Sequence, residues 1–98
     1  MSGEIFEKRF LIWGLVIDQP NIIEKIAGTV RRSPKLFKLV RLYYGSTGED
    51  GKALFYVEIK SNEKNAQRLA TIYENYVEVL KVWWKELDRE EIYSGTMG

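Results

Sequence analysis

Hydrophobic and polar residues alternate most regularly over residues 52–60, which read KALFYVEIK. Successive side chains of a strand point to opposite faces of a sheet, so this alternation predicts a strand with one buried face. The buried set is Ala53, Phe55, Val57 and Ile59. Tyr56 falls on the opposite face and points outward.

A further strand is predicted over residues 5–17, where alternation gives way to hydrophobic residues on both faces. A strand of this kind is usually central in its sheet. A turn-forming segment ends it, and Asn21 with Glu24 resembles a capping box at the start of a helix. Hydrophobic residues then recur at helical spacing until Pro34, which is expected to end this helix.

The middle of the chain predicts a hairpin. Residues 36–44 have the composition of a strand, and the turn-forming segment 45–51, GSTGEDG, joins them to the strand over residues 52–60. A second helix is expected next, capped by Ser61 or Asn62. Its hydrophobic stripe consists of Ala66, Leu69, Ile72, Tyr73 and Tyr76.

Residues 77–87 support two interpretations. Their hydrophobic residues continue the helical spacing of the preceding stripe, which favours a longer helix. Their content of β-branched and aromatic residues favours a strand instead, and Asn75 can end the helix before them. We favour the strand because a β-α-β-β-α unit needs one more strand to complete a common split sheet.

The predicted element order is β-α-β-β-α-β within a single α+β domain over residues 1–98. With right-handed crossovers this order gives the ferredoxin-like fold, a four-stranded antiparallel sheet with two helices on one face. The first strand is hydrophobic on both faces, and the helices can cover only one of them. The sequence therefore predicts that the second face binds a second copy of the chain or another protein subunit.

The amino-acid composition restricts the possible chemistry of the protein more than it restricts the fold. The 98 residues include neither Cys nor His, which removes thiolate sites and the commonest general base. The adjacent carboxylates Glu49–Asp50 and Glu90–Glu91 fall in a turn and near a terminus, where solvation is expected. We therefore expect no catalytic residues, no metal site and no cofactor. The absence of Cys and of a secretory signal favours the cytoplasm, and no segment predicts membrane insertion.

Charge is distributed unevenly along the chain. Residues 25–48 hold six cations and no acid, although the whole chain has a formal charge of +1. Such a segment suits RNA, because Lys and Arg neutralise phosphates, but it also suits the solvated edge of a sheet. The strand over residues 52–60 loosely resembles the base-stacking strand of RNA-recognition domains. The candidate RNA contacts are Arg31, Arg32, Lys35, Lys38, Arg41 and Tyr56.

Three short motifs are similar to the archaeal and eukaryotic RNase P protein component 2 family. They are Lys8-Arg9-Phe10, the hairpin over residues 39–59, and Ser94-Gly95-Thr96-Met97. The segment between the first strand and the hairpin is short for that family. The resemblance implies an RNA-binding accessory subunit of the tRNA 5′-processing ribonucleoprotein. In such an assembly the RNA is the catalyst, and the protein usually pairs with another protein subunit.

A second resemblance competes with the first. Residues 14–28, GLVIDQPNIIEKIAG, are similar to the strand, turn and helix that open ACT-type regulatory domains. Asp18 and Pro20 match the turn of those domains, while Asn21 stands where Gly is usual. This resemblance implies the same fold and a dimer that binds a small molecule. A homodimeric protein-interaction module without RNA is the third interpretation.

Overall fold

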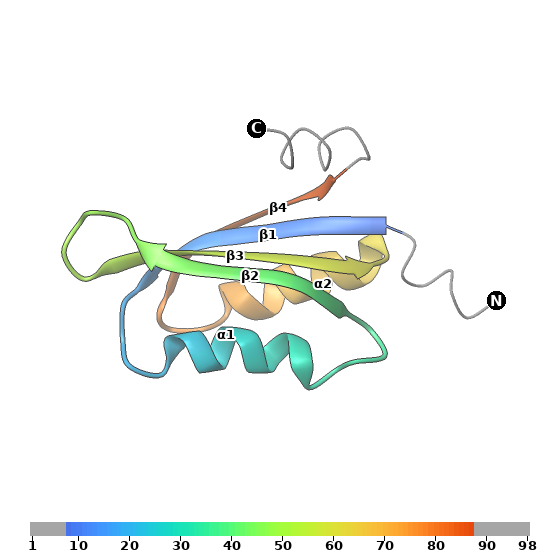
Figure 1. Ribbon diagram of the computed structural model, residues 1–98, viewed down its shortest axis with the longest axis horizontal. Helices are drawn as coiled ribbons and strands as arrows, with labels where there is room; N and C mark the ends of the chain where they lie inside the picture. The colour runs from blue at the N-terminus through green and yellow to red at the C-terminus, as the bar shows by residue number, and fades with distance from the viewer. Residues whose placement is uncertain (1–7, 88–98) are drawn as a thin grey trace.

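The computed structural model describes residues 8–87. Its elements are β1 (Lys8–Ile17), α1 (Ile22–Arg31), β2 (Lys38–Ser46), β3 (Lys52–Ser61), α2 (Glu63–Glu74) and β4 (Val79–Leu87). The four strands pair antiparallel in the order β2-β3-β1-β4, and both helices lie on one side of the sheet (Figure 1). The predicted ferredoxin-like fold is therefore confirmed.

The core lies between the sheet and the helices. β1 is a central strand, as its hydrophobic character predicts, and between its exposed ends it alternates between half-buried and buried residues. The predicted inner face of β3 is confirmed, because Ala53, Phe55, Val57 and Ile59 are at most 1% exposed. The helices contribute further core residues, which are Ile22, Ile26 and Val30 from α1 and Ala66, Leu69 and Tyr73 from α2.

Tyr73 joins the two helices inside this core. Its side chain is fully buried, and its hydroxyl donates a hydrogen bond of 2.9 Å to the backbone carbonyl of Ile26. Burial raises the pKa of the Tyr73 hydroxyl above its usual range, so the group stays protonated and keeps donating.

The two helices begin differently. Of the two predicted caps of α2, Asn62 is the one observed: its side chain accepts a hydrogen bond of 2.8 Å from the Asn65 backbone N–H. The predicted capping box of α1 is wrong, because the side chain of Asn21 makes no capping bond to that helix. The backbone of Asn21 is not extended, so its side chain is not directed at the first N–H groups of α1. α1 ends at Arg31, shortly before Pro34, as expected.

The strand interpretation of residues 77–87 is confirmed by β4. Val82 and Trp84 pack against the core, while Lys81 and Trp83 are exposed, which is the alternation of a strand. β2 begins at Lys38 rather than at residue 36, because a turn precedes it. No helix within residues 8–87 is long and apolar enough to cross a bilayer. Three segments from the sequence analysis lie outside the described residues: residues 5–7 of the predicted first strand, Glu90–Glu91 and Ser94–Met97.

Candidate functional site

One face of the sheet is turned away from both helices, and we term it the open face. Four aromatic residues cross it in a single row, one from each strand: Tyr43, Tyr56, Trp13 and Trp83. We term them the aromatic row. The ring centroids of the two tyrosines lie 5.8 Å apart, and those of the two tryptophans lie 6.0 Å apart with nearly parallel planes. Tyr43 is 57% exposed and Trp83 is 39% exposed, so the row is accessible at both ends.

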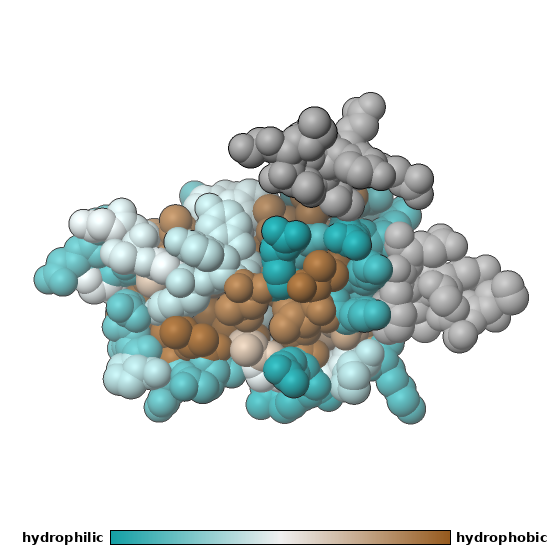
Figure 2. Space-filling view, viewed as in Figure 1, coloured by the Kyte–Doolittle hydropathy of each residue, from teal (hydrophilic) through white to brown (hydrophobic). Residues whose placement is uncertain are grey.

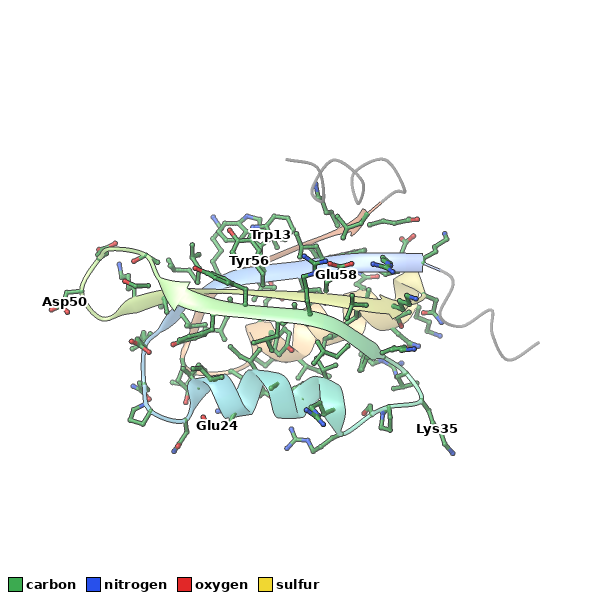
Figure 3. All side chains as sticks on the ribbon, in the orientation of Figure 1. Trp13, Glu24, Lys35, Asp50, Tyr56 and Glu58 are labelled. Atoms are coloured by element: carbon green, nitrogen blue, oxygen red, sulfur yellow. The ribbon has the colours of Figure 1, made fainter. Side chains whose placement is uncertain are left out.

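Leucines widen the hydrophobic part of the open face. Leu15 of β1 and Leu54 of β3 are paired in register beside the aromatic row, and Leu11 lies on its other side. All three are half-buried. Figure 3 shows Trp13 and Tyr56 on the side of the sheet opposite to the helices. A continuous hydrophobic surface of this kind is typical of a binding surface.

Cations surround this hydrophobic centre. Glu58 lies among them, and it is only 6% exposed. Its carboxylate accepts a hydrogen bond of 3.0 Å from Nη1 of Arg9 and lies 3.1 Å from Nε of Arg41. A buried carboxylate needs such partners, and two guanidinium groups leave the cluster with a net positive charge. Lys81 adds a further cation, whose Nζ lies 5.3 Å from the ring centroid of Trp83.

The six residues predicted to contact RNA do not lie in one place. Tyr56 is in the aromatic row, and Arg41 is beside it with its guanidinium held by Glu58. The other four follow the C-terminal end of α1 into the start of β2: Arg31, Arg32, Lys35 and Lys38. We term these four the basic end. Figure 3 shows Lys35 far from Trp13 and Tyr56.

The basic end borders a hollow of about 510 Å³, which we term the basic hollow. Its lining residues are Val30, Arg31, Pro34, Phe37, Lys38 and Leu39. Val30 and Phe37 are only 1% and 3% exposed, so the hollow has a hydrophobic floor. The sequence indicated the cations of this segment but not the floor, because the floor forms only when the loop after α1 folds back toward β2.

β2 is an edge strand, and its irregular pairing and exposed cations make it a poor partner for a further strand. Figure 2 shows hydrophobic surface over β2 and between β2 and α1. The pairing of β2 with β3 is irregular between Leu39 and Arg41, so Val40 has no partner in the ladder. A bulge and exposed cations both discourage another strand from pairing with such an edge. The exposed cations Lys38 and Arg41 of β2 therefore also fit the second interpretation of the basic segment, a solvated sheet edge.

The turn between β1 and α1, which resembles that of ACT-type domains, is tied to its neighbours. The Asp18 carboxylate accepts a hydrogen bond of 2.7 Å from the Tyr44 hydroxyl, and the Asp18 N–H donates to the Gly51 carbonyl at 2.9 Å. Burial and the Asp18 carboxylate raise the pKa of Tyr44 above its usual range. The turn is thus held against β2 and against the loop of the β2–β3 hairpin.

No family model matches the sequence, and a search of curated proteins gives no match. Solved structures do match. The ACT domain from GTP pyrophosphokinase of Chlorobium tepidum has a TM-score of 0.63 at 16% identity, over 81% of this chain and 96% of that one. The acetolactate synthase small subunit of Thermotoga maritima has a TM-score of 0.67 at 22% identity, over 83% of this chain and 48% of that one.

A third solved structure is 30S ribosomal protein S6 of Thermotoga maritima, with a TM-score of 0.62 at 13% identity. It aligns over 94% of this chain and 100% of that one. Identities this low show the fold alone. These likenesses do not support the RNase P resemblance, which stays a prediction. The chain therefore shares the ferredoxin-like fold of ACT domains and of ribosomal protein S6.

Proposed function

We propose that the chain is a non-catalytic regulatory module of the ACT type, which dimerises and binds a small molecule. The aromatic row on the open face carries this proposal. The likeness of the fold to ACT domains and the Asp18–Pro20 turn support it. A regulatory module needs a surface for assembly and a site for its ligand, but it needs no catalytic group.

The open face has the composition of an assembly surface. Trp, Tyr and Arg contribute most of the energy at protein interfaces, whereas Lys is depleted from their centres. Here Trp13 and Tyr56 lie on the two central strands, whereas Trp83 and Lys81 lie on the edge strand β4. In a twofold dimer the same patch faces itself, so one aromatic row would stack on the other. The surrounding cations would then repel each other.

Replacing Trp83 with Gln is expected to raise the dissociation constant of the dimer by at least about tenfold. Trp83 is exposed on the edge strand, so its loss removes contact area without opening the core. Sedimentation equilibrium measures the effect. Higher salt is expected to strengthen the wild-type dimer, because it screens the repulsion between cations.

The matched control is Val77→Gln, which removes a 90% exposed hydrophobic residue from the turn between α2 and β4. It should leave the dissociation constant unchanged. A chain that stays monomeric at high concentration and high salt would contradict the dimer.

A second candidate function is RNA binding by an accessory subunit similar to RNase P protein component 2. One observation favours it: within residues 8–87, no carboxylate forms an ion pair with any of the four cations of the basic end. Unpaired cations are available to phosphates. Binding at this end would involve phosphates alone, because Tyr56 and the aromatic row lie elsewhere.

Replacing Arg31, Arg32 and Lys35 together with Gln is expected to weaken RNA binding on all sequences alike. The slope of log affinity against log salt should flatten by about 2 units, since each phosphate on a single strand contributes about 0.7. Filter binding with one structured RNA and one unrelated RNA measures both effects. Equal slopes of log affinity against log salt for wild type and variant would show that the basic end does not contact RNA.

A further inference from the structure

We infer that the basic hollow is a ligand site for a small organic anion, one with a carboxylate or phosphate group on a hydrophobic body. The inference builds on the proposed regulatory function by naming the class of its ligand. The hollow itself is argued from its own residues.

The shape and lining of the basic hollow suit a small molecule. Its volume of about 510 Å³ lies within the range of about 300–1,000 Å³ that is usual for ligand sites. Val30 and Phe37 form a buried floor, and Pro34 and Leu39 add hydrophobic walls. A hydrophobic body placed there would remove its own apolar surface and that of Pro34 and Leu39 from water, which stabilises the bound state.

The positive charges around the basic hollow favour the binding of an anion. Arg31 and Lys38 line it, and both are exposed and outside every ion pair formed among residues 8–87. Arg32 and Lys35 lie in the loop between α1 and β2, and residues 25–48 contain no acid. A head group of negative charge would therefore meet cations without displacing an existing carboxylate partner.

The C-terminal end of α1 opposes an anion, because the last carbonyls of a helix carry partial negative charge. Two of these carbonyls are already satisfied. The Arg32 N–H donates to the Gly28 carbonyl at 2.9 Å, and the Ser33 N–H donates to the Val30 carbonyl at 3.3 Å. The four full charges of the basic end outweigh the remaining partial charge.

Two other hollows and the β1–α1 turn provide a comparison. A hollow of about 330 Å³ on α2 also has two cations, Lys64 and Arg68, but its lining residues are exposed or half-buried. A hollow of about 380 Å³ beside β4 is lined by Glu74. At the turn, Asp18 already accepts from Tyr44 and would repel an anion. Only the basic hollow, among these, combines a buried hydrophobic floor with unpaired cations.

Titration of the full chain, followed by ¹⁵N–¹H correlation spectra, tests the inference. The probes are 3-phenylpropionate and phenyl phosphate, with the neutral 3-phenylpropanamide as the uncharged comparison. Both anions are expected to shift the backbone amides of residues 30–39 and to leave the indole signals of Trp13 and Trp83 unchanged. The neutral amide is expected to bind at least about fivefold more weakly, because it lacks the charge–charge attraction.

The double variant Arg31→Gln, Lys38→Gln should weaken anion binding by about tenfold. The matched control Lys64→Gln, Arg68→Gln removes the same charge beside the hollow on α2 and should bind as wild type does. Equal affinities for the two double variants would overturn the inference, as would shifts confined to the open face or no binding. A short RNA that shifts residues 30–39 when neither anion does would also overturn it, in favour of RNA.

The oligomeric state, measured in parallel, separates this inference from the proposed function. A monomer that binds the anions at residues 30–39 would support the ligand site and contradict the dimer. A dimer that binds none of the probes would overturn the ligand site and would still agree with the open face as the assembly surface.

Discussion

Replacing Phe55 with Ala is expected to lower the free energy of unfolding by about 3–5 kcal/mol. The Phe55 side chain is fully buried in β3, and its ring packs edge-on against Tyr73 with centroids 5.2 Å apart. Truncation removes this contact and leaves a cavity between the sheet and α2, so the transfer and cavity penalties add. Chemical denaturation measures the change.

Leu54→Ala on the same strand is the control for Phe55→Ala. Leu54 points to the open face and is half-buried, so its truncation should cost only about 1 kcal/mol. A loss below about 1 kcal/mol for Phe55→Ala would show that the assigned inner face of β3 is wrong.

Replacing Gly14 with Ala is expected to destabilise the protein by about 3 kcal/mol, although it adds only one methyl group. A Cβ at this position would overlap the backbone carbonyl oxygen of Lys81 on β4 and would lie 2.8 Å from a ring carbon of Phe55. The carbonyl belongs to the backbone and cannot rotate away, so β4 must shift against β1. Denaturation gives the free energy, and amide hydrogen exchange should show the loss of protection in β4.

Gly28→Ala provides the comparison for Gly14→Ala. A Cβ at Gly28 meets no atom within 4 Å, and the residue lies inside α1. Alanine is a better helix former than glycine, so this variant should gain up to about 1 kcal/mol. If the two alanine variants had the same stability, the close packing of β1 against β4 at Gly14 would be incorrect.

Local patterns predicted most of the fold. The alternation over residues 52–60 defines β3 and its inner face, because a period of two is incompatible with a helix. Residues 77–87 were harder, because the spacing of Leu80, Trp83 and Trp84 suits a helix, whereas the β-branched and aromatic composition of the segment suits a strand. What decides the outcome is pairing with β1, which is a contact between residues far apart in the sequence.

The candidate site was predicted only in part, because it depends on register. Tyr56 was expected to face outward, but the alignment of Tyr43 and Trp83 with it requires the pairing of all four strands. Irregular pairing also changes which residues share a face. Lys38 and Arg41 are three positions apart, yet they pair with Lys60 and Glu58, which are two apart. An alternation counted along β2 alone cannot show this.

The ion pairs of Glu58 with Arg9 and Arg41 favour one register of β1 and β2 against β3. The Glu58 carboxylate on β3 is held by Arg9 from β1 and by Arg41 from β2, so it joins three strands at one point. A slip of either neighbour by one residue would turn its arginine to the opposite face and would weaken the compensation of a buried charge. The cluster thus penalises mispaired sheets more than it stabilises the native one. It selects a single arrangement of strands, the one in which the four aromatic rings meet.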